Sequence, residues 1–150
     1  MPIIKNQQIS ENTWTFVADE SPLTSGDITV SLKRWTENKD QLLEHAGAIG
    51  VRLAPNESVE LLADDLSSIS LVELEFPVFT DGRSFSQARL LRDRFGYQGE
   101  IRAVGNFLTD QVFYLRRVGV DAFDINQPRD IELALAALND FSVKYQASSN

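Results

Sequence analysis

The residues best suited to chemistry lie in two short turns in the second half of the chain. The turns Thr80–Arg83 (TDGR) and Gly105-Asn106 each follow a short apolar run and precede an amphipathic segment. An arginine beside a helix N-terminus can hold a carboxylate, sulfate or phosphate, because the guanidinium and the free N–H groups both attract anions. The sequence therefore predicts an anion-binding corner at Arg83, with Thr80, Gly105 and Asn106 as further contacts.

Four further residues bear on the chemistry of this corner. Two arginines are further candidates for the same anion: Arg52, at the end of a predicted strand, and Arg102, in the run Ile101–Val104. Asp81 could orient Arg83 or act as a general base, and Asp110 is a second candidate base. A structural interpretation stays open for both acids, since Asp-Gly favours turns and an acid in the first turn of a helix is stabilised by the helix dipole.

Several other kinds of chemistry are excluded by composition. The chain has no cysteine and one histidine, His45. Disulfides, thiolate-held zinc or iron–sulfur clusters and a thiol nucleophile are therefore excluded, and an ordinary zinc site is not predicted. Neither GxGxxG nor GxxxxGK[ST] occurs, so no cofactor is predicted from a recognisable motif.

The elements that must position these residues alternate between strand and helix from residue 26 to residue 145. Five amphipathic segments follow apolar runs, so the sequence predicts an α/β fold with a parallel sheet of about five strands and alternating helices. The sheet is either open and doubly wound or a partial barrel, and in both cases ligands lie beyond the carboxyl ends of the strands. The predicted strands are Ile28–Trp35, Gly47–Leu53, Leu71–Phe79, Ile101–Val104 and Val120–Ile125.

Three helix boundaries follow from capping chemistry. Thr36 is predicted to cap the first helix. Ser84 is predicted to cap a later helix in a capping box with Gln87, and Gly96 or Gly99 to end that helix.

The first 25 residues differ from the rest. Ile3-Ile4 and Thr13–Val17 predict a β-hairpin around a polar turn at residues 8–12, or an antiparallel addition to the edge of the sheet. Its apolar face carries Trp14 and Phe16, which suits core packing or, as the alternative, a subunit interface in a homodimer. The 150 residues are expected to form one domain, with a frayed polar tail at residues 146–150.

The charge distribution is uneven and limits the class of partner. The formal net charge is −8, yet residues 83–117 hold seven of the ten arginines and only three acids. This pattern suits a small anion or an acidic partner surface better than nucleic acid. For Arg89, Arg92 and Arg94 the alternative is a solvated helix face, with Arg89 pairing Asp93. No signal-peptide or membrane-spanning pattern occurs, so a cytoplasmic location is expected.

The central segment resembles the signature of a bacterial family of unknown function. The family pattern is F-TDGR-FSQARLLR, then GE-RAVG, then DQ--FL-R-G-DAF, and Ser84 stands where the family often has Gly. The matching positions are Phe79–Arg83, Phe85–Arg92, Gly99-Glu100, Arg102–Gly105, Asp110-Gln111, Leu115, Arg117, Gly119 and Asp121–Phe123. Members of this family are commonly described as oxidoreductases of sulfite reduction.

The resemblance implies a pathway and leaves three functions open. The first is an accessory protein of assimilatory sulfite or sulfate reduction that binds a small sulfur oxyanion or the sulfite reductase. The second is a cofactor-free, barrel-like enzyme with Asp81 or Asp110 as base and Arg83 as electrophile. The third is a non-catalytic module whose basic segment docks on an acidic partner.

Overall fold

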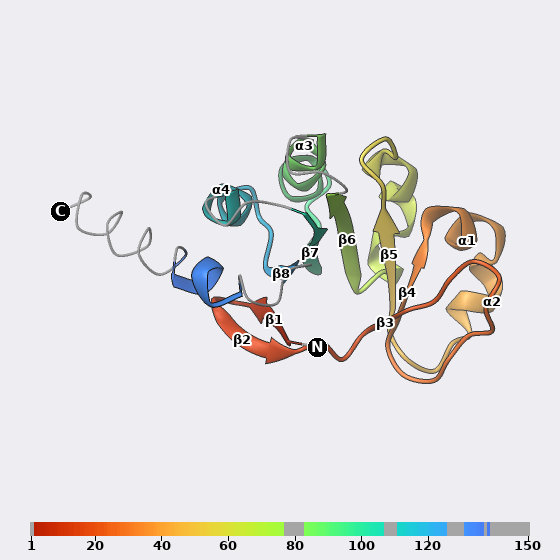
Figure 1. Cartoon of the computed structure of the whole chain (residues 1–150). Coiled ribbons are helices and arrows are strands. Elements are labelled where there is room, and N and C mark those ends of the chain that lie inside the picture. Colours follow the sequence, from red (N-terminus) through yellow and green to blue (C-terminus); the bar gives the residue numbers. More distant parts are fainter. Residues whose placement is uncertain (1, 77–82, 107–110, 126–130, 137, 139–150) are drawn as a thin grey trace.

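The computed structural model describes residues 2–76, 83–106, 111–125, 131–136 and 138, which form a curled α/β half-barrel (Figure 1). Eight strands make one sheet in the order β2-β1-β8-β7-β6-β5-β4-β3. Strands β3 to β8 are parallel to one another, whereas β1 is antiparallel to both β8 and β2. The strands are β1 (Pro2–Lys5), β2 (Gln8–Glu11), β3 (Thr15–Phe16), β4 (Ile28–Ser31), β5 (Ile49–Leu53), β6 (Leu71–Phe76), β7 (Glu100–Gly105) and β8 (Ala122–Ile125).

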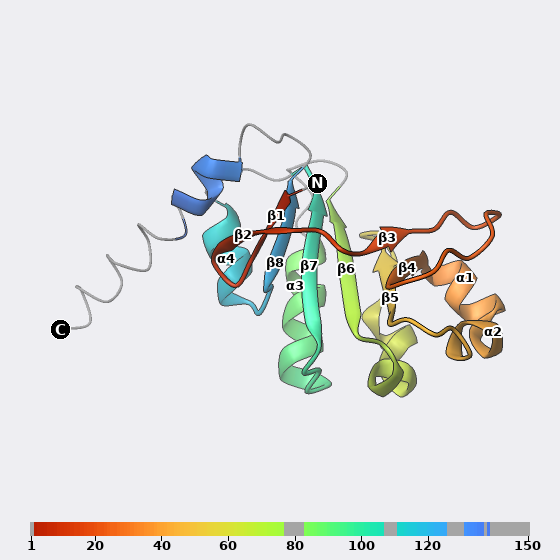
Figure 2. The same cartoon turned by 90° about the horizontal axis from the view of Figure 1, so that it is seen from below.

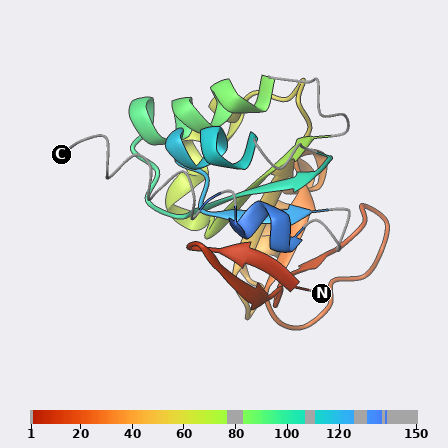
Figure 3. The same ribbon diagram turned by 60° about the vertical axis from the view of Figure 1, so that its left-hand side comes forward.

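Helices α3 and α4 cover one face of the sheet, and the N-terminal segment covers the other (Figures 1 and 3). The helices are α1 (Leu32–Glu37), α2 (Lys39–Leu43), the 3₁₀ helix η1 (Val59–Ser68), α3 (Arg83–Arg89), its π-helical continuation η2 (Leu90–Arg94) and α4 (Gln111–Arg117). Residues 131–136 are also helical.

The two faces of the sheet differ in chemistry because successive side chains on a strand point to opposite sides. The outer face is apolar and packs in one core with buried helical residues such as Ala88, Leu91 and Leu115. Its strand residues include Val51, Leu53, Val72, Leu74, Phe76, Ile101, Ala103 and Phe123. On the inner face the central strands present Arg52, Glu73 and Arg102.

The sheet is larger than predicted, and the N-terminal strands pair differently. A hairpin is present, but its arms are β1 and β2 and its turn lies at Asn6 and Gln7, which both have positive φ. The predicted second arm, Thr13–Val17, instead supplies β3, which pairs in parallel with β4 at the opposite edge. The chain reaches that edge by crossing the inner face (Figure 2).

Two predicted caps were wrong. The strand expected to run to Trp35 ends at Ser31, whose hydroxyl accepts the Arg34 N–H at 3.1 Å and starts α1 five residues before Thr36. Ser84 lies inside α3 and donates to the Glu75 carbonyl at 3.2 Å. Gln87 makes no capping box, because its side chain binds the Glu57 carbonyl and the Val59 N–H.

Gly105 is required where β7 ends beside β6. Its φ is +117°, and a Cβ at this position would lie 2.5 Å from the carbonyl oxygen of Phe76. Gly105→Ala is therefore expected to lower the free energy of unfolding by at least about 3 kcal/mol, measured by urea denaturation.

Gly96→Ala is the matched control for this substitution. Gly96 also has positive φ, +63°, but a Cβ there meets nothing within 4 Å. This change should cost only about 1 kcal/mol. Equal losses for the two variants would contradict the proposed clash at Gly105.

Candidate functional site

A row of charged side chains crosses the inner face at the level of Glu73. Arg52 on β5, Glu73 on β6 and Arg102 on β7 are direct neighbours in the register of the sheet. Arg52 Nε donates to Glu73 Oε1 at 3.0 Å, and Arg102 Nη1 lies 3.8 Å from Glu73 Oε2. Glu73 is only 2% exposed, so the two guanidiniums stabilise a carboxylate that burial alone would disfavour.

The row continues toward β1 with alternating sign. Glu100, two residues before Arg102 on the same face of β7, accepts Arg102 Nε at 3.1 Å and Nη2 at 2.7 Å. Lys5 Nζ on β1 lies 2.8 Å from the other carboxylate oxygen of Glu100. Each charge therefore has an opposite neighbour, which offsets the desolvation of Arg102, the most deeply buried of these cations at 1% exposure.

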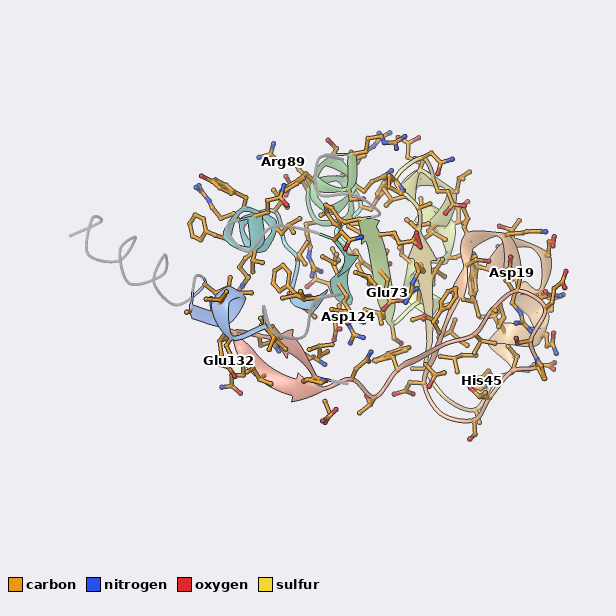
Figure 4. The ribbon with its side chains drawn as sticks, in the orientation of Figure 1. Asp19, His45, Glu73, Arg89, Asp124 and Glu132 are labelled. Atoms are coloured by element: carbon orange, nitrogen blue, oxygen red, sulfur yellow. The ribbon has the colours of Figure 1, made fainter. Side chains whose placement is uncertain are left out.

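The segment between β2 and β3, together with Phe16 of β3, packs on part of this row. Asn12 Oδ1 accepts Arg102 Nη1 at 2.9 Å and also the Trp14 backbone N–H at 3.0 Å. The Phe16 ring lies 4.0 Å from the Arg52 guanidinium carbon, a cation–π contact. The inner face is thus filled by the protein's own groups. Glu73 is labelled on this face in Figure 4.

The predicted anion contacts fall in two separate places. Arg52 and Arg102 are brought together, but by Glu73 and within the inner face. Gly105 and Asn106 lie at the carboxyl edge, where Gly105 pairs with Phe76 and the Asn106 N–H donates to the Phe76 carbonyl at 2.7 Å.

Arg83 lies at the same carboxyl edge and is exposed. It begins α3, and its neighbour Ser84 is held to the carbonyl of Glu75 near the end of β6. Thr80, Asp81 and Asp110 lie outside the described residues. The predicted corner is therefore represented by Arg83, Gly105 and Asn106.

The arginines of α3 and η2 were predicted either to bind a partner or to be solvated, and Arg92 does neither. Its guanidinium donates to the carbonyls of Tyr97, Gly99 and Gly119 and forms an ion pair with Asp121 at 2.6 Å. Burial raises the pKa of the Tyr97 hydroxyl, which donates to the Ile69 carbonyl at 2.8 Å. Arg92 therefore holds the loop after η2 against the end of α4.

Three further arginines are exposed on α3 and α4, namely Arg89, Arg116 and Arg117, and with the exposed Tyr114 they define the basic face. Arg89 is 71% exposed, and its predicted partner Asp93 lies at 4.0 Å, the limit of an ion pair. A hollow of about 540 Å³ separates the two helices. Its lining is Phe85, Arg89, Gln111, Tyr114, Arg117 and Val118.

Three residues with polar roles were missed by sequence reasoning. Glu73 was not among the candidate site residues, yet it is buried and bound by Arg52. Asn12 was assigned to a turn, yet it contacts Arg102 from a distant part of the sequence. Arg34 was placed in a strand, but it lies in α1 with one guanidinium nitrogen unbonded. Alternation along the predicted strand gives the face on which Glu73 lies, but its pairing with Arg52 follows from the register of β5 and β6.

A metal site and a membrane-spanning helix are both absent from the part of the chain that the structure describes. Within those residues, no group of three His, Cys, Asp or Glu side chains lies close enough to hold a metal ion. No described helix combines the length and the apolar character needed to span a bilayer.

Glu73→Gln tests the charged row. The substitution keeps the shape of the side chain but leaves two arginines without their shared carboxylate. The free energy of unfolding should fall by about 3 kcal/mol in chemical denaturation. Glu60→Gln, which breaks the exposed ion pair with Arg94, is the matched control and should cost less than about 1 kcal/mol. Similar losses in the free energy of unfolding for both variants would show that the buried row is no more stabilising than an exposed ion pair.

The comparison with known families assigns residues 50–150 to one family model, described as bacterial protein of unknown function (DUF934). No curated protein matches the sequence. The matched residues include Glu73, Arg102 and both helices of the basic face, whereas β1 to β4 and α1 precede the match. Since the match covers more than half of the chain, the protein belongs to the DUF934 family of bacterial proteins.

Proposed function

We propose that this protein is a non-catalytic accessory protein of sulfite reduction, which docks through its basic face on an acidic surface of the sulfite reductase. The pathway comes from the family resemblance of the central segment. The mode of action comes from the surface chemistry of α3 and α4. The exposed arginines of the basic face are the observation that carries the proposal.

These arginines have few ties within the protein. Arg116 forms no ion pair with a described residue, and Arg117 lies near the Phe113 ring, with 5.9 Å from the guanidinium carbon to the ring centroid. Beside them Tyr114 leaves 56% of its surface in solvent. Arginine and tyrosine are the side chains most enriched at the energetic centres of protein interfaces.

The difference in charge between the basic face and the chain as a whole favours one docking orientation. The chain as a whole carries −8, so a cluster of arginines is a surface on which an acidic partner meets less repulsion than elsewhere. Such complementarity accelerates encounter and selects the docking geometry more than it raises affinity. The hollow between α3 and α4 would receive an apolar or aromatic side chain from the partner.

A small sulfur oxyanion is the second candidate ligand, supported by the shared position of Arg83, Gly105 and Asn106 at the carboxyl edge. Arg52 and Arg102 are left out of this site, because Glu73 binds both and Asn12 also binds Arg102. The enzyme alternative depends on Asp81 and Asp110, which lie outside the described residues. Docking is preferred because the structure describes the side chains of the basic face and they are exposed to solvent.

The test measures binding of the purified chain to assimilatory sulfite reductase by biolayer interferometry. Arg89→Gln, Arg116→Gln and Arg117→Gln should each weaken binding about three- to tenfold, and the double variant Arg116→Gln/Arg117→Gln more than tenfold. Binding should also weaken as salt rises from 50 to 500 mM, since exposed charges are screened.

Arg94→Gln is the matched control. It also removes one exposed positive charge, but from a side chain that pairs with Glu60 outside the basic face. Its affinity should stay within twofold of wild type. No binding by the wild-type chain, or equal losses for Arg94→Gln and Arg116→Gln, would refute docking through the basic face.

A further inference from the structure

A second hollow lies at the carboxyl ends of β3 and β4, apart from the basic face and ahead of the residues that define the family. It measures about 640 Å³, within the range of small-molecule sites. Its lining comes from the end of β3, the loop that follows and α1, at the edge of a parallel sheet where ligands bind. The charged side chains around it are Asp19, Glu20, Lys33, Arg34 and Glu37.

Arg34 is the residue that marks this hollow as more than a surface depression. It is only 9% exposed, although it carries a permanent charge. Its Nη1 donates to the Ala18 carbonyl at 2.6 Å, whereas its buried Nε has no hydrogen-bond partner. A buried donor without an acceptor costs about 1–3 kcal/mol, so an acceptor supplied by a ligand would remove a real penalty.

The geometry of the guanidinium specifies which group fits. Because Nη1 is already engaged by Ala18, the edge formed by Nε and Nη2 is the one that remains. Two parallel N–H groups on one edge match the two oxygens of a carboxylate. The cationic half of the site therefore favours a carboxylate over a single-atom anion.

The acidic residues decide between a simple anion and a zwitterion. Asp19, Glu20 and Glu37 outnumber Lys33 and Arg34, so the lining is negative overall. Asp19 is fixed by the Ser31 hydroxyl, which donates to Oδ1 at 2.5 Å. A charge pair at 4 Å is worth about 1–4 kcal/mol near a protein surface, enough to repel a dianion such as sulfate and to attract an ammonium group.

We infer that this hollow binds a small zwitterion of the α-amino-acid class. The carboxylate of the ligand lies on the Nε–Nη2 edge of Arg34, and its ammonium group faces Asp19, Glu20 and Glu37. The Phe16 ring, which lines the hollow, offers an apolar surface to the ligand's side chain. This site is independent of the docking proposed for the basic face.

The test screens the twenty protein amino acids singly at 10 mM against the full chain by thermal denaturation, followed by calorimetric titration of any that respond. At least one amino acid should raise Tm, through binding to the folded state alone. Acetate carries only the carboxylate, methylamine only the ammonium group and sulfate neither. At the same concentration each should leave Tm unchanged.

Variants separate this site from a general effect of solutes. Arg34→Gln should weaken binding of the responding amino acid at least tenfold, and Arg94→Gln, an exposed arginine elsewhere, should bind as wild type does. If Arg34→Gln fails to fold, the exposed Glu37→Gln provides the second measurement and should weaken binding severalfold. Arg116→Gln/Arg117→Gln should retain the response, which keeps this result distinct from failure of docking.

Three results would overturn the inference. One is a wild-type chain whose Tm no amino acid raises. Another is acetate or sulfate acting as strongly as the amino acids, which would indicate a simple anion site. The third is unchanged binding by Arg34→Gln or, where that variant does not fold, by Glu37→Gln.

Discussion

The buried carboxylate of Glu73 is the constraint on which the inner face depends. A carboxylate at 2% exposure requires positive partners, and the parallel register of β5, β6 and β7 places one arginine on each side of it. The arginines in turn need acceptors for their remaining N–H groups, which Glu100 and Asn12 provide for Arg102. The N-terminal segment crosses the inner face, and this path brings Asn12 to the Arg102 guanidinium.

Closure of the inner face shifts recognition to other surfaces. In a half-barrel the carboxyl edge of the sheet is the expected place for ligands, whereas the inner face is normally filled by side chains. Here the inner face is occupied by an alternating row of charges and covered by Asn12 and Phe16. The chemistry that remains accessible lies on the outer helices, at the basic face, and at the carboxyl edge near Arg83 and near Arg34.

Much of the α/β organisation could be predicted from the sequence, because strands β5 to β8 and the helices between them carry strong local patterns. The N-terminal pairing could not, since β3 has only two residues and no local feature distinguishes a hairpin arm from a distant edge strand. The start of α1 was missed because Ser31 and Thr36 are both good caps. The structure has the earlier start, where the Ser31 hydroxyl accepts the Arg34 N–H.

The candidate site was predictable in part for a similar reason. Gly105 and Asn106 were located by their place after a buried strand, and Phe76 pairs with Gly105 as a parallel sheet requires. The roles of Arg52 and Arg102 could not be predicted from the sequence, because an arginine in an apolar run is as compatible with an anion site as with an ion pair. Their shared partner is set by the register of three strands, which no short window of sequence contains.

The most direct test of this account is a double-mutant cycle between Arg52 and Glu73, measured by urea denaturation of wild type, Arg52→Gln, Glu73→Gln and the double variant. The direct bond of 3.0 Å and the burial of the carboxylate predict a coupling energy of at least about 1.5 kcal/mol. Losses that add to within about 0.5 kcal/mol would contradict the account, because the two side chains would then not depend on each other.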